Sequence, residues 1–364
     1  MPSGSHDYDP LGWRAIFGGV LVACAAWLAT RALFYAEKSV VGGPSGNYGY
    51  VPNPEGTQSF LRSLDKPTFR QAGADALAGA VGQDAFLYRY ADKAHRAVYG
   101  TPFTVWNQGS AGTCVSFGWA MGSYIGQSVD WATGRYPNPP KLVATEDIYG
   151  GSRTLARLPP VSTNSGGDGS YGAAAARWVS GKCKDPTVGG ILFRQKYGDV
   201  DLTAYSIPLS RQWGASGVPL PLAKLANTNT ARAVAQVQDW ESLCASIESG
   251  YCVPICSNVG FAATNVRTAE GYLPRGGQWS HCMVICGIRH AKNEGKRDGA
   301  LVLNSWGGVW CSGGKWPADQ PDGSFWISKA DATSILAQGD SFSISGIDFA
   351  YRNLDHGNWL GDNP

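Results

Sequence analysis

A stretch about a third of the way along this 364-residue chain combines a side-chain amide with a cysteine. In "NQGSAGTC", residues 107–114, Gln108 stands six residues before Cys114, and an apolar run follows directly. Because a cysteine attacks as thiolate, a catalytic cysteine needs a lowered pKa, which a helix N-terminus and a nearby imidazolium provide. The apolar residues after Cys114 recur at helical spacing, which predicts that its thiol lies at a helix N-terminus. Taken alone, the pattern favours a buried core cysteine over a nucleophile.

Two distant segments contain residue types that could complete a thiol-based site. His281 opens an apolar run that predicts a strand, and among the five histidines it alone stands between a small polar residue and such a run. Asn304 follows a second predicted strand, and Trp306 comes two residues later. An asparagine can fix an imidazole by accepting its other N–H, and a tryptophan over that bond would exclude water. Taken singly, His281 favours a satisfied core histidine and Asn304 a turn residue.

Together, these segments resemble the papain-like cysteine peptidases. "NQGSAGTC" matches that family's Gln-Gly-x-x-Gly-x-Cys loop, and "SHCMVICG" is similar to its segment of a histidine followed by an apolar strand. "NSWGGVW" matches the Asn-Ser-Trp-Gly-x-x-Trp segment, and "SGGDGSYGAAAARWV" resembles the Gly-rich substrate-binding strand that precedes a helix. The order Gln, Cys, His, Asn is the family's order, and the likeness spans residues 101–351.

The resemblance implies a Cys-His-Asn triad. Cys114 would attack a peptide carbonyl as a thiolate paired with protonated His281, which would then protonate the leaving amine. Asn304 would orient the imidazole, and Trp306 would shield the contact between them. Ser305, which lies between these two residues, is expected to support the site.

The same resemblance implies an oxyanion hole and a strand that binds substrate. The side-chain amide of Gln108 and the backbone N–H of Cys114 would stabilise the oxyanion, an effect of roughly 3 kcal/mol per donor. An extended polypeptide substrate would pair with the backbone of the Gly-rich strand, at Gly167, Asp168, Gly169 and Ser170. Such a site needs no cofactor and no metal ion, and we expect neither.

The chain departs from the family's pattern beside the nucleophile. The family often has a cysteine three residues before the nucleophile, bridged to the Gly-rich region. Here Ala111 takes that place, and Gly167 or Asp168 stands where the partner would fall. Without the bridge, we expect the loop that carries Gln108 to depend on packing, including packing against the chain's own N-terminal segment.

The implied architecture is an α+β, papain-like fold of two subdomains with the active site in the cleft between them. Residues 101–215 are expected to form a mostly helical half that carries the nucleophile. Residues 216–355 are expected to form an antiparallel, β-barrel-like half that carries the histidine and the asparagine, and residues 356–364 form a C-terminal tail.

The N-terminal hundred residues predict an anchor and a connecting segment. Residues 12–35, after a tail of residues 1–11, predict a transmembrane helix with aromatic residues near its ends. Residues 15–30 carry no charge, and their continuation through Arg31 to Tyr35 gives a stretch about long enough to cross a bilayer. A cleaved signal peptide is disfavoured because no basic head precedes the run, and a helix buried against another subunit is the alternative. Residues 36–100 predict a Gly/Pro-rich linker and a juxtamembrane or covering segment, our first candidate for an inhibitory cover over the cleft. We therefore expect a single-pass membrane protein, with the side of the membrane undecided.

The cysteines do not predict a complete disulfide framework. There are nine; with Cys24 in the N-terminal apolar run and Cys114 unbridged, an odd number remains. Two pairs have a spacing that could suit a metal ion, but residues four apart share one face of a strand, so we expect core packing instead. These pairs are Cys252 with Cys256 and Cys282 with Cys286.

Composition and charge restrict the possible partners. The formal net charge is +2, and the basic residues form no cluster of the kind that binds nucleic acid, so we expect no nucleic-acid partner. The function that we predict is a membrane-anchored, papain-like cysteine endopeptidase acting on polypeptides. One alternative is a structural or assembly subunit of a larger membrane or virion complex, in contact with other protein subunits and without significant turnover. Another is a different thiol hydrolase or an acyl transferase.

Overall fold

The computed structural model describes residues 45–80, 82–158, 167–293, 297–347 and 354. All of these belong to one unit, Val40–Pro364, by their contacts. The predicted N-terminal tail (1–11), the predicted transmembrane helix (12–35) and the predicted C-terminal tail (356–364) lie outside the described residues and stay predictions. Within the described residues, no helix combines the length and the apolar character that crossing a membrane requires.

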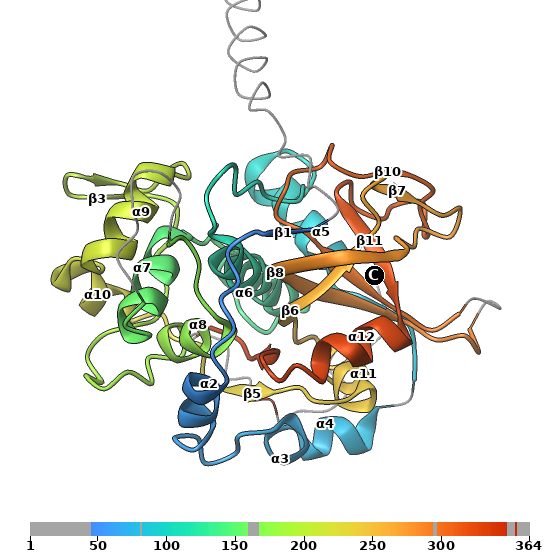
Figure 1. The fold of residues 1–364 in the computed structure, drawn as a ribbon, viewed down its shortest axis with the longest axis horizontal. Helices are drawn as coiled ribbons and strands as arrows, with labels where there is room; N and C mark the ends of the chain where they lie inside the picture. Colours follow the sequence, from blue (N-terminus) through green and yellow to red (C-terminus); the bar gives the residue numbers. More distant parts are fainter. Residues whose placement is uncertain (1–44, 81, 159–166, 294–296, 348–353, 355–364) are drawn as a thin grey trace, which may run out of the picture. The chain divides into compact units, whose positions relative to one another are not determined.

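The helical half is built around α6 (Cys114–Ala132), the central helix in Figure 1. Nearly all of its side chains are buried, as expected for a helix that is surrounded by other elements. The remaining elements of this half lie to one side of α6 in that view: α7 (Glu146–Leu155), α8 (Gly172–Val179), β3 (Lys196–Tyr197), β4 (Val200–Asp201), α9 (Ile207–Ser216) and α10 (Leu220–Ala226).

The other half contains a six-stranded sheet whose central strand is the long β8 (Arg275–Arg289). Its partners are β1 (Ser45–Asn47), β2 (Ala85–Phe86), β6 (Val253–Phe261) and β9 (Gly299–Leu303), and β11 (Ser324–Ser328) continues the sheet beyond β9. Strands β6, β8, β9 and β11 are antiparallel, whereas β1 runs parallel to β8.

The expectation of a β-barrel-like half is wrong in one respect. The described strands form an open sheet, because among the named strands β6 pairs with β8 only and β11 with β9 only. Helices and short two-stranded pairs cover the sheet instead of further strands closing it. These are α11 (Trp240–Glu248), α12 (Lys329–Leu336), β5 (Val234–Gln236) with β12 (Phe342–Ile344), and β7 (Val266–Arg267) with β10 (Ser312–Gly313).

Residues 36–100 contribute strands β1 and β2 to the sheet and, within the described residues, four helices from position 54 onward. Helix α2 (Pro54–Leu61) begins with a proline after Asn53, whose side chain accepts a hydrogen bond from the N–H of Gly56, as a helix N-cap does. Its Phe60 is buried, 6.0 Å between ring centroids from Phe342 of β12. The other helices of this segment are α3 (Phe69–Ala72), α4 (Ala74–Gly79) and α5 (Tyr88–Tyr99).

Two glycines allow α6 to approach the sheet closely. A Cβ atom on Gly118 would lie 3.0 Å from the carbonyl oxygen of Met283 on β8, and one on Gly122 would lie 3.4 Å from Val284. Because these glycines follow Cys114 at intervals of four residues, all three lie on one face of the helix. The N-terminus of α6 is therefore held directly against the strand that carries His281.

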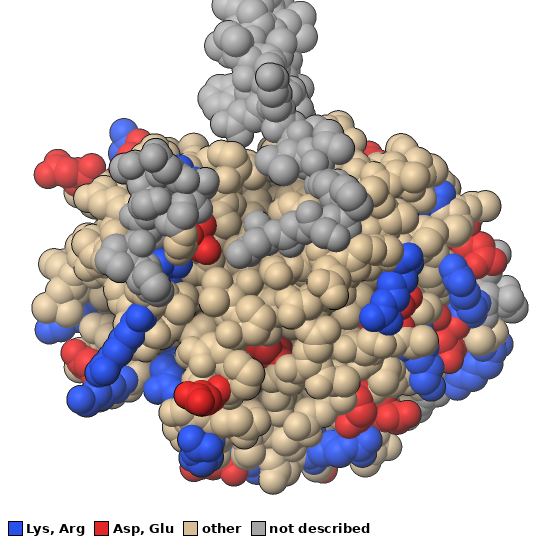
Figure 2. Space-filling view, viewed as in Figure 1, with Lys and Arg blue, Asp and Glu red and all other residues tan. Residues whose placement is uncertain are grey.

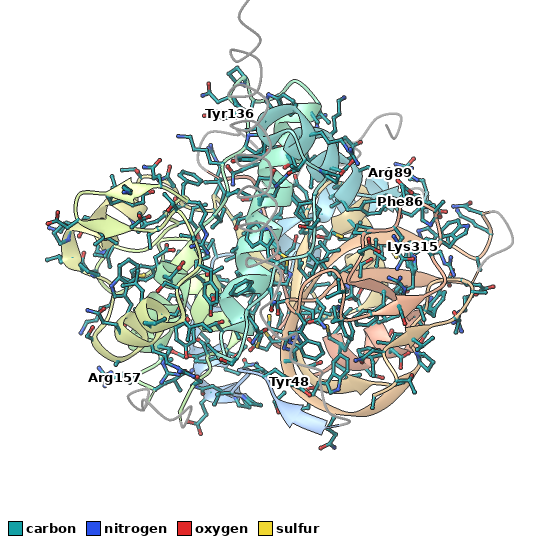
Figure 3. All side chains as sticks on the ribbon, turned by 90° about the horizontal axis from the view of Figure 1, so that it is seen from above. Tyr48, Phe86, Arg89, Tyr136, Arg157 and Lys315 are labelled. Atoms are coloured by element: carbon teal, nitrogen blue, oxygen red, sulfur yellow. The ribbon has the colours of Figure 1, made fainter. Side chains whose placement is uncertain are left out.

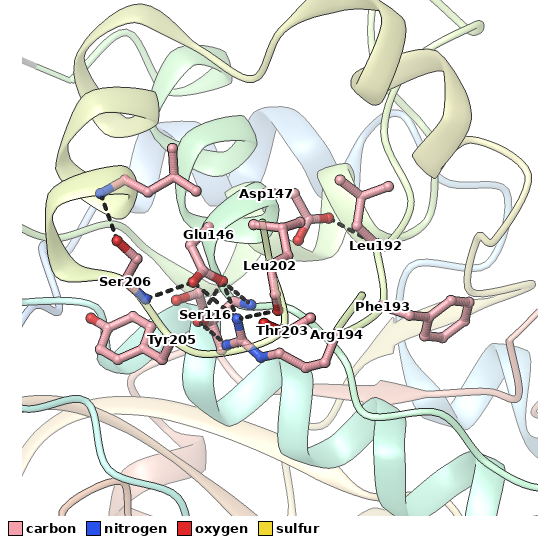
Figure 4. Close-up of polar contacts among 12 residues, drawn as sticks. Ser116, Glu146, Asp147, Leu192, Phe193, Arg194, Leu202, Thr203, Tyr205 and Ser206 are labelled. Carbon is pink, nitrogen blue, oxygen red and sulfur yellow. Dashed lines mark hydrogen bonds and ion pairs between the residues drawn. The ribbon is translucent and has the colours of Figure 1, made fainter. Parts of the chain in front are cut away.

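A buried ion pair organises the loop that packs beside the start of α6 (Figure 4). The guanidinium of Arg194 lies 2.7 Å from the carboxylate of Glu146, which also accepts a hydrogen bond of 2.8 Å from the N–H of Ser206. A buried carboxylate needs such donors to compensate for its lost hydration. The adjacent Tyr205 shares a 2.8 Å hydrogen bond with Thr113, the residue before the nucleophile candidate. The ion pair thus helps to fix the position where α6 begins.

The charged side chains are sparse and lie mainly toward the margins of the face shown in Figure 2. This arrangement agrees with the low share of charged residues, 16% of the chain. The surface over α6 is largely uncharged in this view.

Two helical glycines offer a matched test of the packing. A Cβ on Gly151 of α7 would lie 2.0 Å from the ring of Trp178, whereas one on Gly126 of α6 would meet no atom within 4 Å. We expect Gly151→Ala to lower the free energy of unfolding by about 2 kcal/mol through overpacking. Gly126→Ala should raise it by up to about 1 kcal/mol, because alanine favours the helix. Urea unfolding of both variants checks this, and equal effects would contradict the packing described for α7 and α8.

Candidate active site

Cys114 is the first residue of α6, as the sequence predicts, and it is fully buried. Its Sγ accepts a hydrogen bond from the backbone N–H of Cys282 at 3.3 Å. Burial raises the pKa of the Cys114 thiol well above its usual value, and backbone hydrogen bonds, including those from Cys282 and Val115, act in the opposite direction. In this state the sulfur is a thiol, although the donors that would stabilise a thiolate are in place.

His281 and Asn304 are brought together by neighbouring strands. His281 lies within β8 and Asn304 directly follows β9, so that Nε2 of the imidazole is 2.7 Å from Oδ1 of the asparagine. An amide oxygen only accepts hydrogen bonds, so this contact places a proton on Nε2. Nδ1 is buried and makes no hydrogen bond within the described residues. Burial lowers the pKa of His281 to about 4, partly opposed by the hydrogen bond with Asn304, and the ring is therefore neutral here.

Trp306 stacks on the imidazole of His281. The ring centroids are 4.8 Å apart, the planes are inclined by 27°, and the indole is buried. Cys282, the next residue along β8, is the one that donates its N–H to Cys114. The thiol therefore lies against Cys282 of β8, and the asparagine amide and the indole lie against the neighbouring residue, His281.

The loop before α6 is bound to the loop that carries the asparagine. The N–H of Gln108 donates to the carbonyl of Ser305 at 2.8 Å, and the N–H of Gly307 donates to the carbonyl of Trp106 at 3.0 Å. The hydroxyl of Ser305 donates to Oε1 of Gln108 at 2.5 Å. The backbone N–H of Ser305 donates to Oδ1 of Asn304 at 2.7 Å. Since Oε1 is the acceptor, Nε2 of Gln108 is the end of the amide that can donate to another group.

The Nε2 amide of Gln108 already holds a backbone carbonyl of the chain's own N-terminal segment. It donates to the carbonyl of Tyr48 at 3.0 Å and to that of Ala111 at 2.8 Å. The predicted oxyanion donor is thus occupied by a peptide group. Packing of the Gln108 loop against the N-terminal segment, which we expected in place of a disulfide, is observed at this contact.

The segment of residues 48–51, here called the cover, is hydrogen-bonded to both halves of the fold. The N–H groups of Tyr48 and Tyr50 donate to the carbonyl of Ser280 on β8, at 2.9 and 3.2 Å. On the other side, Ser170 donates its N–H to the carbonyl of Gly49 and accepts from the N–H of Val51, both at 2.8 Å. The chain that enters as β1 and continues to α2 therefore crosses over α6 between the halves (Figure 1).

Three residues of the cover fit the site closely. The ring of Tyr48 lies where the two halves meet (Figure 3), 5.4 Å from the imidazole of His281 and 4.7 Å from the indole of Trp306 between centroids. Gly49 has a φ of +117°, and a Cβ there would lie 2.1 Å from the carbonyl oxygen of Gly112, so that only glycine fits. Tyr50 is buried, and its pKa is raised by burial and by nearby acidic groups, foremost Asp340.

The predicted substrate-binding residues differ in what they contact. Ser170 pairs with the cover through its backbone, and its hydroxyl donates to Ser152 at 2.7 Å. Gly169 is buried, and its N–H donates to the hydroxyl of Tyr149 at 3.0 Å. Gly167 is exposed and adopts a φ of +86°. Ser170 is thus joined to the cover by two backbone hydrogen bonds.

Asp168 connects the Gly-rich segment to the nucleophile loop. Its carboxylate accepts a hydrogen bond from the N–H of Gly112 at 3.4 Å, and it forms a 3.0 Å ion pair with Arg211 of α9. The hydroxyl of Tyr149 donates to it at 3.0 Å. A polar contact therefore joins the two segments that a disulfide joins in many relatives of the resembled family.

Sequence reasoning missed several groups that act through their backbone. The N–H of Cys282 and the carbonyls of Tyr48 and Ala111 carry no residue-type signal, because every residue has them. The glycine between two tyrosines at positions 48–50 was the available signal for the cover. Within the described residues, no cluster of three His, Cys, Asp or Glu side chains could hold a metal ion.

Comparison with solved structures finds cysteine proteases among those similar to this chain. Xylellain, a cysteine protease from Xylella fastidiosa, superposes with a TM-score of 0.50 at 17% identity, over 84% of this chain and 97% of that chain. Digestive procathepsin L 3 of the Tenebrio molitor larval midgut has a TM-score of 0.43 at 13% identity, over 82% of this chain and 83% of that chain. Bromelain from Ananas comosus has a TM-score of 0.41 at 13% identity, over 73% of this chain and 100% of that chain.

No protein-family model matches the chain, and no curated protein matches its sequence. At 17% identity, the likeness to xylellain concerns the fold alone. The mixed α+β architecture that the sequence predicts is therefore confirmed, and the chain has the fold of the papain-like cysteine proteases.

Proposed function

We propose that this protein is a latent cysteine endopeptidase that hydrolyses peptide bonds with Cys114 as the nucleophile and His281 as the acid and base. One observation carries the proposal: the amide of Gln108 holds the backbone carbonyl of Tyr48 directly beside the buried thiol site. The cover is a stretch of polypeptide, bent at Gly49, whose backbone bonds to both walls, at Ser280 and Ser170. These backbone hydrogen bonds support the proposal, because a peptidase substrate is also bound through its main chain.

The residues divide the reaction between them. With a substrate in place of the cover, Nδ1 of His281 takes the proton of Cys114, and the thiolate attacks the peptide carbonyl. The oxyanion is stabilised by the Nε2 amide of Gln108 and the N–H of Cys114. The imidazolium, held by Asn304, then protonates the leaving amine. Water, activated by the neutral imidazole, hydrolyses the thioester and restores the thiol.

Room for a substrate side chain supports the same proposal. A cavity of about 340 Å³ lies beside the cover and is lined on one side by residues of the N-terminal segment, including Tyr50 and Thr57. On the other side it is lined by Asn258 and Asp340. When the cover leaves, the space of the Tyr50 ring joins this cavity, and the enlarged pocket can receive a large side chain of the substrate.

The cover accounts for the latent state. While it is in place, Cys114 is fully buried and the amide of Gln108 already holds the carbonyls of Tyr48 and Ala111. Activity therefore requires displacement of residues 48–51. We propose that residues 12–35 anchor the protein in a membrane and that it acts on polypeptides; contacts with other protein subunits stay a prediction.

Gly49→Ala tests the cover directly. The added Cβ would strike the carbonyl of Gly112, so we expect the cover to leave the site and the rate of Cys114 alkylation by iodoacetamide to rise at least about tenfold. Peptide mapping by mass spectrometry identifies the labelled cysteine. Gly126→Ala, where a Cβ meets no atom, is the control and should label at the wild-type rate. An unchanged rate in Gly49→Ala would refute the covering role.

The catalytic roles are tested in the uncovered Gly49→Ala protein with a peptide library. We expect Cys114→Ala to abolish cleavage and Gln108→Ala to lower kcat/KM by about 10²–10³-fold, because one oxyanion donor is lost. Gln212→Ala, at an exposed position of α9, is the control and should keep full activity. Alkylation of Cys114 without any cleavage would instead favour the structural-subunit alternative.

The buried neutral imidazole predicts a pH dependence of stability. An unfolded histidine binds a proton below about pH 6.5, whereas His281 stays neutral down to about pH 4, so the unfolded state binds more protons between these values. The free energy of unfolding should therefore decrease as the pH is lowered from about 6.5 to about 4. This decrease should be up to about 3 kcal/mol larger in the wild type than in His281→Gln. Denaturant unfolding at each pH measures this. Gln212→Ala, which keeps every histidine, should follow the wild-type curve, and parallel curves for all three proteins would contradict the prediction.

A further inference from the structure

We propose that Cys282 and Cys256 form a redox relay that repairs an oxidised Cys114 by moving the oxidation, as a disulfide, into the sheet beneath the active site. The inference rests on the proposed function only in requiring a reactive thiol at Cys114 once the cover has left. It assigns a role to two buried thiols that the peptidase reaction does not use.

Cys282 lies against the nucleophile. Its N–H contacts Sγ of Cys114 at 3.3 Å. A Cβ on Gly118, one turn further along α6, would lie 3.2 Å from Sγ of Cys282. The sulfur of Cys282 therefore packs on the same face of α6 as Cys114, in space that is open only because residue 118 has no side chain.

Cys256 lies directly across the sheet from Cys282, in the register of β6 and β8. In an antiparallel ladder, opposed residues alternate between hydrogen-bonded and non-hydrogen-bonded pairs. The N–H of Cys282 points to Cys114 and not to β6, and the carbonyl of Ser280, two residues earlier, points to the cover. The pair is therefore of the non-hydrogen-bonded kind, with a Cα separation of about 4.5 Å, which lies within the range that a disulfide spans.

The side chains of this pair are also in contact. Burial, and next to it the side chain of Cys282, raises the pKa of the Cys256 thiol well above its usual value, as expected for neighbouring side chains on one face of the sheet. Three sulfurs thus follow one another from the nucleophile into the sheet: Cys114, Cys282 and Cys256.

The relay has three balanced steps with a hydroperoxide as the oxidant. The thiolate of Cys114 attacks the peroxide, the O–O bond breaks, and a sulfenic acid and an alcohol form (water, from hydrogen peroxide). The thiol of Cys282 attacks the sulfenic sulfur, a disulfide between the two residues forms, and water leaves. The thiol of Cys256 then attacks Sγ of Cys282, which forms the cross-strand disulfide and returns Cys114 as a thiol. In sum, one hydroperoxide is reduced and two thiols are oxidised.

A second cysteine pair supplies a matched control. Val253 of β6 pairs with Ile285 of β8, so the next residues outward, Cys252 and Cys286, also lie opposite each other. The carbonyl of Cys286 accepts a hydrogen bond from the N–H of Leu87 and therefore points away from β6. This pair has the same cross-strand arrangement as Cys256 with Cys282. It lies four residues further along both strands, away from the nucleophile.

The experiment treats full-length Gly49→Ala protein with graded hydrogen peroxide and maps its cysteines by mass spectrometry. We expect a disulfide between Cys256 and Cys282, with Cys114 recovered as a thiol. Cys256→Ala should stop the relay at the disulfide between Cys114 and Cys282. Cys282→Ala, with Cys282→Ser as a second variant in case one folds poorly, should form neither disulfide of the relay and should accumulate sulfinic acid at Cys114. Cys252→Ala should behave as its parent.

Sulfinic acid at Cys114 in the parent protein, with Cys256 and Cys282 still reduced, would overturn the relay. So would an effect of Cys252→Ala as large as that of Cys282→Ala. The mass readout does not need peptide cleavage: disulfide formation without cleavage contradicts the peptidase alone, and cleavage without the disulfide contradicts the relay alone.

Discussion

The pairing of two loops from opposite halves is the constraint on which the site depends. Gln108 and Trp106, just before α6, exchange backbone hydrogen bonds with Ser305 and Gly307, just after β9. Each of these loops leads directly into a regular element that cannot shift without breaking core contacts. The short bridge therefore fixes the distance between the nucleophile's helix and the strands that carry the imidazole and its asparagine. The side chain of Ser305 adds to it by orienting the amide of Gln108.

This arrangement explains why one short segment can silence the whole site. The cover competes for groups that are already oriented: the amide of Gln108, the carbonyl of Ser280 and the backbone of Ser170. Because these groups are preorganised and bind backbone, the cover loses little free energy in ordering them, and its intramolecular attachment gives it a high effective concentration. Gly49 adds shape specificity, since its lack of a side chain lets the chain pass against Gly112. The same preorganisation serves catalysis when the cover is absent.

The sequence predicted the parts of the site that depend on residue type. The six-residue step from Gln108 to Cys114 and the segment from Asn304 to Trp306 indicated chemistry that side chains perform, and the structure brings these residues together. The position of the cover could not be predicted in the same way, because it is held by backbone groups of Tyr48, Gly49 and neighbouring residues. The open sheet was also not predictable, since strand pairing at its edges depends on helices such as α11 and α12 that cover it.

The contact between Asp168 and the nucleophile loop has a consequence for where this fold can work. A disulfide at that place would hold only above a certain ambient redox potential and would open in the presence of thiol reductants. The bonds from Asp168 to Gly112, Arg211 and Tyr149 involve no electron transfer. The geometry of the loop therefore does not depend on the redox potential that thiols such as glutathione set in the surroundings. It responds to ionic strength instead, because the half-buried guanidinium of Arg211 remains within reach of screening ions.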